Sequence, residues 1–190
     1  MAPKLIILDR DGVINVDSPD YIKSAHEWVP IEGSIAAIGR LHRAGYRIVI
    51  ATNQSGIGRG LFDRDILEGM HNKLREMVDK EGGVIDGIYY CPHLPEDGCL
   101  CRKPATGLLD AISRDYSTSL SGVPMVGDSL KDLEVALATG CRPILVQTGK
   151  GADTESKLNK LSSQWRQLTV LPNLSAVANL LIASNGVHFK

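Results

Sequence analysis

The sequence predicts an α/β protein with three layers, in which a mostly parallel sheet lies between helices, as in Rossmann-like folds. Two observations support this prediction. Short apolar runs alternate along the chain with segments of helical periodicity. The apolar runs also lack the in–out alternation of strands that have one exposed face. With 190 residues the chain is long enough to bury a large core, and we expect residues 1–190 to form one domain.

Six segments are predicted as strands. They cover residues 4–8, 46–53, 84–90, 123–127, 142–147 and 168–171. The first, "KLIIL", is apolar after its lysine, and the second, "YRIVIATN", is rich in β-branched residues. These features are typical of strands that are buried on both faces.

Helices are predicted between these strands. They cover residues 34–45, 63–83, 106–116, 129–140 and 174–184, with a loop and a further helix within the polar segment 149–165. The second helix has Asp63 or Asp65 as its cap and ends at Gly82. The fourth begins at a capping pair of Ser129 and Asp132.

Composition and charge give no indication of a macromolecular partner. The net charge is −1, with 43% hydrophobic and 23% charged residues, which is ordinary for a globular protein. We therefore expect no nucleic-acid or membrane partner, and a monomer with a small-molecule substrate. The apolar stretch near the N-terminus is too short for a secretory signal, so we expect a cytoplasmic protein. Thiols stay reduced there, and clustered cysteines then more often bind metal than pair.

Polar groups follow four of the predicted strands. "DRDG" follows the first strand, "TNQSG" the second and "GDSLKD" the strand 123–127, while the strand 84–90 leads through a cysteine-containing loop to Arg102 and Lys103. Ligands of parallel sheets bind at the carboxyl ends of the strands. The sequence therefore predicts one site to which all four segments contribute.

Three of these groups are carboxylates. Asp9 and Asp11, one residue apart, could divide nucleophilic attack and proton transfer between them. With Asp128 they form an oxygen set suited to Mg²⁺. The alternative is an ordinary turn after a strand, where Asp and Gly are common.

Thr52, Asn53 and the basic pair could bind phosphate. The hydroxyl and amide groups donate hydrogen bonds, Lys103 provides a positive charge, and Arg102 provides a bidentate donor for a second anionic group. The alternative for both cations is a solvated surface position.

The loop 91–101 carries three of the four cysteines of the chain. Cys91, His93, Cys99 and Cys101 offer three thiolates and an imidazole, which suits tetrahedral Zn²⁺. Four protein ligands would leave no open position, so we interpret the zinc as structural, fixing the basic pair that follows. A redox pair or incidental thiols are the alternative.

The four segments together resemble the haloacid dehalogenase (HAD) superfamily of phosphohydrolases. "LDRDGVIN", "IATNQS", Lys103 and "VGDSLKD" resemble its four motifs over roughly residues 4–135. "TNQSGIGRG" and the cysteine loop before "CRKP" resemble the subfamily of heptose 1,7-bisphosphate 7-phosphatases and histidinol-phosphate phosphatases. "DGIYYCPH", "GCLCRKPATGLL" and "QTGKG" resemble its heptose branch, through about residue 151.

The resemblance implies a role for each matching residue. Asp9 would be the nucleophile that forms a phosphoaspartyl intermediate, and Asp11 the general acid and then base. Thr52 and Lys103 would stabilise the transferring phosphoryl group. Mg²⁺ would be held by Asp9, the backbone carbonyl of Asp11, and Asp128. The implied substrate-binding residues are Asp17, Ser18, Pro19, Asp20, Tyr21, Asn53, Gln54, Ser55 and Arg102.

The implied activity is Mg²⁺-dependent removal of the 7-phosphate of D-glycero-D-manno-heptose 1,7-bisphosphate, in ADP- or GDP-heptose biosynthesis. Histidinol phosphate or another small phosphomonoester is the alternative substrate, and a non-catalytic zinc-stabilised binding protein is the alternative of another class. Ser129 stands where many heptose enzymes have lysine, so either a cationic contact is missing or Lys131 replaces it. With no long insertion between the first two strands, we expect a HAD-like fold with an inserted zinc loop and no separate cap domain.

Overall fold

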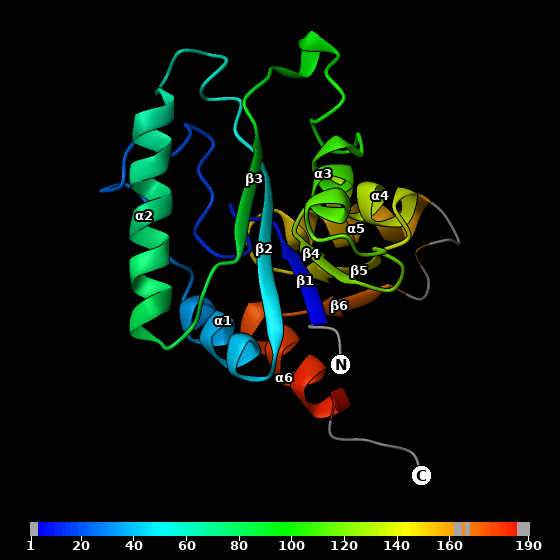
Figure 1. Ribbon diagram of the computed structural model, residues 1–190. Helices are drawn as coiled ribbons and strands as arrows, with labels where there is room; N and C mark the ends of the chain where they lie inside the picture. Colours follow the sequence, from blue (N-terminus) through cyan, green and yellow to red (C-terminus); the bar gives the residue numbers. More distant parts are fainter. Residues whose placement is uncertain (1–3, 162–164, 166–167, 186–190) are drawn as a thin grey trace.

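The computed structural model, which describes residues 4–161, 165 and 168–185, contains a six-stranded sheet (Figure 1). Neighbouring strands are parallel and lie in the order β3-β2-β1-β4-β5-β6. The strands are β1 (Lys4–Leu8), β2 (Tyr46–Asn53), β3 (Gly87–Cys91), β4 (Pro124–Gly127), β5 (Arg142–Val146) and β6 (Thr169–Leu171).

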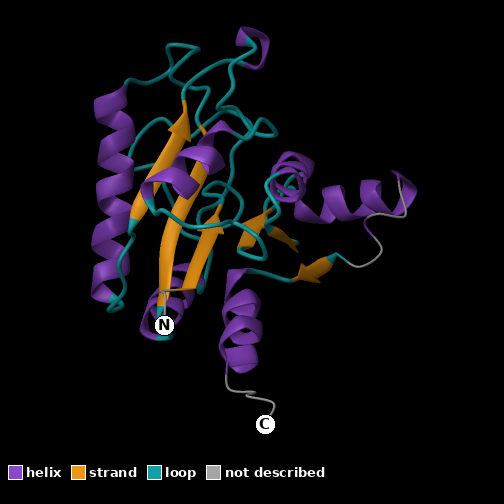
Figure 2. Ribbon diagram, turned by 45° about the vertical axis from the view of Figure 1, so that its right-hand side comes forward, coloured by secondary structure: helices purple, strands orange, loops and turns teal. Residues whose placement is uncertain are grey.

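Helices cover both faces of the sheet. They are α1 (Ser34–Arg43), α2 (Arg64–Lys80), α3 (Gly107–Asp115), α4 (Leu130–Ala138), α5 (Gly151–Leu161) and α6 (Leu174–Asn185), with a short 3₁₀ turn at Pro95–Asp97. Figures 1 and 2 show α1, α2 and α6 on one side of the sheet and α3, α4 and α5 on the other. The predicted three-layer α/β fold is thereby confirmed.

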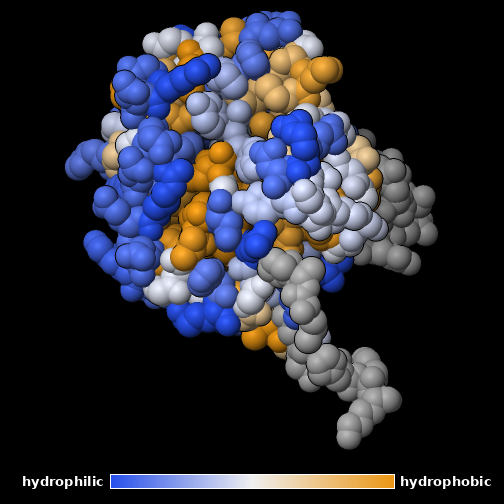
Figure 3. Space-filling view, viewed as in Figure 1, coloured by the Kyte–Doolittle hydropathy of each residue, from blue (hydrophilic) through white to orange (hydrophobic). Residues whose placement is uncertain are grey.

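The central strands are buried on both faces. In β1, Ile6 and Leu8 join the core beneath α1, α2 and α6, whereas Leu5 and Ile7 join the core beneath α3 and α4. This is why the strand is apolar without alternation, as the sequence suggested. On α2 most polar side chains face solvent, whereas His71 is buried, and Figure 3 shows that side of the molecule as mostly hydrophilic.

The third strand differs from its predicted range of 84–90. It begins at Gly87 and reaches Cys91, the first residue of the cysteine cluster. The later start has a physical reason. The Asp86 backbone N–H donates to the Ile48 carbonyl (2.8 Å), but the Ile48 N–H donates to the Asp86 carboxylate (2.8 Å), so a side chain takes one of the two backbone bonds there. The prediction was wrong by three residues at the start of this strand.

The helix caps follow the sequence signals. Asp63, not Asp65, caps α2 by accepting from the backbone N–H of Ile66 (2.8 Å). At the start of α4 the Asp132 carboxylate accepts from the backbone N–H and the hydroxyl of Ser129 (3.1 and 2.6 Å).

The strand order determines where a ligand can bind. The chain moves outward from β1 to β3 and then returns to place β4 on the other side of β1, so the switch point lies between β1 and β4. The loops after these two strands carry the predicted carboxylates. Among the described residues no second sheet or helical bundle is inserted, and none of their helices is long and apolar enough to span a bilayer.

Candidate active site and cysteine cluster

A cavity of about 720 Å³ opens at the carboxyl ends of β1, β2 and β4. Residues from all four predicted segments line it. Of the predicted catalytic, magnesium and substrate residues, the lining includes Asp9, Asp11, Asp17, Ser18, Pro19, Tyr21, Thr52, Asn53, Gln54, Ser55, Arg102, Lys103 and Asp128. Asp20 is exposed and does not belong to the lining.

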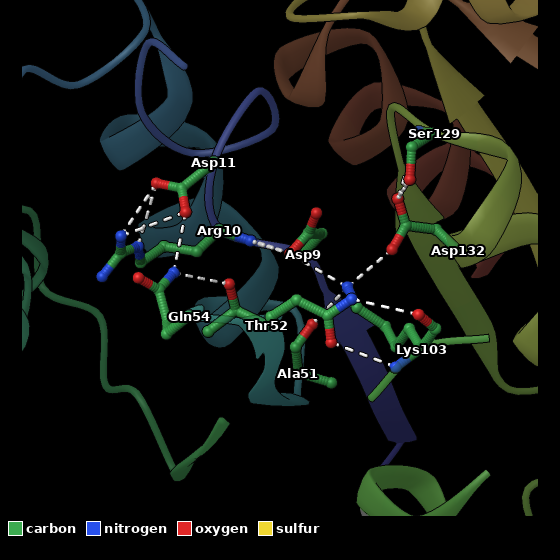
Figure 4. Close-up of polar contacts among 10 residues, drawn as sticks. Asp9, Arg10, Asp11, Ala51, Thr52, Gln54, Lys103, Ser129 and Asp132 are labelled. Carbon is green, nitrogen blue, oxygen red and sulfur yellow. Dashed lines mark hydrogen bonds and ion pairs between the residues drawn. The ribbon is translucent and has the colours of Figure 1, made fainter. Parts of the chain in front are cut away.

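Lys103 lies at the centre of the polar contacts in Figure 4. Its Nζ is 3.0 Å from Asp9 Oδ1 and 2.6 Å from Asp132 Oδ1, and it donates to the backbone carbonyl of Ala51 at 2.7 Å. The side chain is only 2% exposed. Three acceptors therefore satisfy the three donors of the ammonium group and fix its position beside Asp9.

The carboxylates around Lys103, those of Asp9, Asp128 and Asp132, lie close enough to repel one another. Burial raises the pKa of Asp9 to about 8; Lys103 lowers it in part, and the neighbouring carboxylates, Asp132 first, raise it further. Burial likewise raises the pKa of Asp128 to about 7. Burial alone would lower the pKa of Lys103, but Asp132 and Asp9 outweigh it and raise that pKa. The site therefore has more negative charge than its lysine neutralises, which suits a divalent cation.

Two glycines permit the approach to Asp128. A Cβ atom at Gly12 would lie 2.0 Å from Asp128 Oδ2, and one at Gly149 would lie 2.2 Å from it. The backbone N–H of Lys150 donates to the same oxygen (2.8 Å), and the Thr154 hydroxyl donates to the Asp128 backbone carbonyl (2.8 Å). The loop before α5 therefore holds the carboxylate against β1.

Asp11 accepts hydrogen bonds from three side chains. Arg10 donates from Nε (3.2 Å) and Nη2 (2.9 Å to Oδ1, 3.0 Å to Oδ2), Asn15 donates at 2.8 Å and Gln54 at 2.7 Å. Burial raises the pKa of Asp11, but the Arg10 charge and these hydrogen bonds outweigh it and hold the pKa below its ordinary value. Gln54 also donates to the Thr52 hydroxyl (2.9 Å), which links two of the predicted catalytic groups.

The segment 17–21 forms one wall of the cavity. Lys150 Nζ is 2.7 Å from Asp17 Oδ2, which ties the segment to the loop before α5. At its other end Tyr21 has a φ of +64° and lies under the guanidinium of Arg59, at 5.8 Å from the ring centroid. A non-glycine residue in the left-handed region beside a cavity indicates a backbone that its surroundings constrain.

Asn53 joins β2 to the basic pair. Its amide nitrogen donates to the Lys103 carbonyl (3.1 Å) and its amide oxygen accepts from the Lys103 N–H (3.0 Å). Arg102 is held from the other side, since its Nη1 donates to the backbone carbonyl of His93 (3.2 Å). The basic pair is therefore fixed between a strand end and the cysteine loop.

The four predicted zinc ligands lie together. A ring nitrogen of His93 and the three sulfur atoms all lie within 4.8 Å of one another. The Cys101 sulfur is 3.1 Å from the Cys91 sulfur, 3.6 Å from the Cys99 sulfur and 3.3 Å from His93 Nδ1. In tetrahedral zinc sites, zinc–sulfur distances of about 2.3 Å place sulfur atoms roughly 3.8 Å apart. The cysteines are free thiols, and this donor set fits Zn²⁺.

Several groups at the site were missed by the sequence prediction. Arg10 stood out in the sequence only as part of a motif, yet it is 1% exposed and contacts Asp11 directly. Lys150, Thr154 and Lys157 also line the cavity. The only available signal was the polar run "QTGKG" after a predicted strand, because partners from distant segments leave no periodic pattern. Asp132, predicted as part of the capping pair of α4, also accepts from the Lys103 ammonium group.

Two family models match the chain. Residues 4–132 match the model described as polynucleotide kinase 3 phosphatase, and residues 100–177 match the one described as HAD-hydrolase-like. Together these ranges contain both strands at the switch point, the cysteine loop and the basic pair.

Curated relatives and solved structures show a more specific similarity to this chain than the family models do. The D-glycero-beta-D-manno-heptose-1,7-bisphosphate 7-phosphatase of Pseudomonas aeruginosa is 56% identical over 157 residues, which are 83% of this chain and 88% of that protein. The crystal structure of D,D-heptose 1,7-bisphosphate phosphatase from B. bronchiseptica, complexed with magnesium and phosphate, has a TM-score of 0.90 at 48% identity; the match covers 95% of this chain and 99% of that one.

The crystal structure of D,D-heptose 1,7-bisphosphate phosphatase from Burkholderia thailandensis matches with a TM-score of 0.73 at 40% identity. This match also covers 95% of this chain and 99% of that one. Matches of this extent cover the whole catalytic fold, and the resemblance seen in the sequence is confirmed. The chain belongs to the HAD-like hydrolases and, within them, to the family of the D-glycero-beta-D-manno-heptose-1,7-bisphosphate 7-phosphatases.

Proposed function

We propose that the protein is a Mg²⁺-dependent phosphatase that removes the 7-phosphate of D-glycero-β-D-manno-heptose 1,7-bisphosphate. One observation carries the proposal: the Asp9 carboxylate lies at the cavity, 3.0 Å from the buried Lys103 ammonium group, in a chain whose relatives bear this enzyme's name. The β configuration is taken from the names of those relatives.

The residues present fit a magnesium ion. Asp9 and Asp128 are close enough to share a cation, and burial and mutual repulsion disfavour their charged forms without one. We propose that Asp9, Asp128 and the backbone carbonyl of Asp11 hold it. When bound, the ion would neutralise charge on the phosphoryl oxygens and on the nucleophile.

The protein groups then divide the chemistry. An Asp9 oxygen forms a bond to the 7-phosphorus as the bond from phosphorus to the sugar oxygen breaks. Asp11, whose pKa is held low in the free site, takes up a proton when the phosphate binds and gives it to that sugar oxygen. Water next attacks the phosphorus and gives a proton to Asp11, while the Asp9–phosphorus bond breaks and releases phosphate. The Thr52 hydroxyl and the Lys103 ammonium group stabilise the transferring phosphoryl group.

The second phosphate of the substrate needs its own cation. Arg102 and Lys131 both line the cavity, and no ion pair of either was found among the described residues. We propose that they bind the 1-phosphate, with Lys131 providing the charge that Ser129 lacks. The other lining residues of segments 17–21 and 53–55 would contact the sugar.

The cysteine cluster has a structural role in this proposal. Zn²⁺ held by Cys91, His93, Cys99 and Cys101 would have no open coordination position. Its effect on catalysis is then indirect, because the His93 carbonyl accepts from Arg102 and the loop leads directly into Lys103.

We also propose that residues 1–190 act as one domain, as a monomer and in the cytoplasm. The three thiols of the cluster require a compartment that keeps them reduced. Elution of active protein at twice the mass of one chain would contradict the monomer.

The test is Mg²⁺-dependent phosphate release, with kcat/KM compared for the α and β anomers of the heptose bisphosphate and for histidinol phosphate. We expect a preference for the β anomer. Asp9→Asn protein is the blank. A preference for histidinol phosphate would overturn the substrate, and equal activity in the blank would overturn the site.

A further inference from the structure

We propose that Arg10 is a positioning residue for the proton-transfer group Asp11, and that His71, on α2, holds Arg10 in place from behind. This inference rests on the proposed function, because it assigns a purpose to the general acid of that reaction. The observations behind it are a chain of contacts from the surface of α2 to the cavity.

Arg10 is a buried cation whose guanidinium group contacts two side chains, Asp11 and His71. It is 1% exposed, although charged side chains are seldom buried unless they are paired. Nε and Nη2 donate to Asp11, with Nη2 reaching both carboxylate oxygens. Figure 4 shows the guanidinium group reaching Asp11 on the side away from Lys103. The planar group therefore determines the orientation of the carboxylate.

His71 completes the arrangement. It is 1% exposed, and its Nε2 lies 3.4 Å from Arg10 Nη1. A guanidinium group only donates, so Nε2 is the acceptor and Nδ1 carries the hydrogen. That hydrogen faces Glu68 Oε2, which is 3.6 Å from Nδ1. Burial, and next the charge of Arg10, lower the pKa of His71 to about 4, so the ring is neutral as this arrangement requires.

The catalytic consequence concerns the leaving group. A sugar alkoxide leaves readily only if a proton reaches it as the phosphorus–oxygen bond breaks, and positioned acids contribute about 10²- to 10⁴-fold to such steps. A misplacement of about 1 Å can cost about 10²-fold. Loss of the Arg10 contact should therefore slow the reaction of a sugar phosphate, and leave that of an activated aryl phosphate nearly unchanged, since its phenolate leaves without a proton.

The experiment compares kcat/KM for the heptose bisphosphate and for 4-nitrophenyl phosphate on one preparation of each variant. The ratio of the two values does not depend on the fraction of folded protein. We expect Arg10→Lys to lower the ratio about 10- to 100-fold. His71→Leu should lower it about three- to tenfold, and His71→Gln, whose amide oxygen can accept from Arg10, should restore it.

Two controls separate the possible failures. Asp11→Asn should lower the ratio strongly; if it lowers both activities equally, the acid assigned in the proposed function is wrong. Arg40→Lys changes an arginine that bonds to α6, remote from the cavity, and should leave the ratio unchanged. If Asp11→Asn behaves as expected but the Arg10 and His71 variants lose both activities in proportion, or raise the ratio, the positioning role is overturned.

Discussion

The cavity and the cysteine loop both offer metal ligands, but the two regions are held in different ways. Around the cavity, protein groups already position the carboxylates: Lys103 joins Asp9 to Asp132, and Lys150 holds Asp128. The tip of the loop, in contrast, is largely exposed, and its Leu100 is 82% exposed. Its ligands therefore depend on each other and on a shared ion for their arrangement.

This difference indicates what each metal would do. A metal at the cavity joins a framework that the sheet has built, so its removal should stop the chemistry and leave the fold. A metal in the loop would create the local framework, so its removal should loosen the loop and, through Arg102 and Lys103, weaken a site that it never touches.

The largest effect is expected from the nucleophile. Asp9→Asn should lower kcat more than about a thousandfold, because the amide cannot form the phosphoaspartyl bond. The melting temperature should stay the same or rise, since burial disfavours the charged form of this residue. Asp20→Asn is the matched control: this side chain lies outside the lining, so the variant should keep full activity. Unfolded Asp9→Asn protein would contradict the view that the site is prearranged.

The next largest effect is expected from loss of the metal in the cysteine loop, residues 91–101. Cys99→Ser should lose bound zinc, lower the melting temperature, and reduce kcat/KM about 10- to 100-fold by releasing Arg102. Metal analysis, thermal melting and kinetics on one preparation would check this. Cys141→Ser is the control, because that thiol lies outside the cluster and its loss should leave the zinc content unchanged. Full activity without zinc would show that the loop does not hold the basic pair.

Much of this contrast could be predicted from the sequence, because short motifs at the ends of parallel strands have to meet. The cysteine cluster and the acidic site were located in this way. What the sequence could not give were contacts between side chains that are distant along the chain. Gln54, predicted to bind substrate, also donates to Asp11, and the Asp86 carboxylate accepts from the backbone N–H of Ile48 before the start of β3. Neither contact leaves a periodic pattern.

A smaller effect is expected where the backbone approaches a metal ligand. Gly149 has a φ of +59°, and its missing Cβ leaves room for Asp128 Oδ2. Gly149→Ala should displace the carboxylate and raise the Mg²⁺ concentration for half activity about 10- to 100-fold. Gly60→Ala is the matched control, since Gly60 has a φ of +68° but no atom of the described residues lies within 4 Å of where its Cβ would stand. Both substitutions strain the backbone, so only a difference in Mg²⁺ dependence between them supports the prediction.

The smallest effect is a pH dependence that should distinguish the two metals. The pKa of Asp9 is raised from 3.8 to about 8 and that of Asp128 to about 7, in both cases first by burial. A carboxyl whose pKa is higher in the folded state favours folding while protonated. In metal-free protein this contribution is lost as the pH rises from about 4 toward 8. Mg²⁺ binds the ionised form, so it should raise the melting temperature more at about pH 8 than at about pH 6.

Thermal melts with and without Mg²⁺ at the two pH values would measure this, with zinc kept in the loop throughout. Asp9→Asn removes the group with the larger pKa shift, so the difference between the two pH values should shrink in that variant. An equal Mg²⁺ effect at both pH values in the unaltered protein would mean that the carboxylates are already ionised at about pH 6. The cavity would then be neutralised by its own lysine, and its contrast with the cysteine loop would be smaller than the structure indicates.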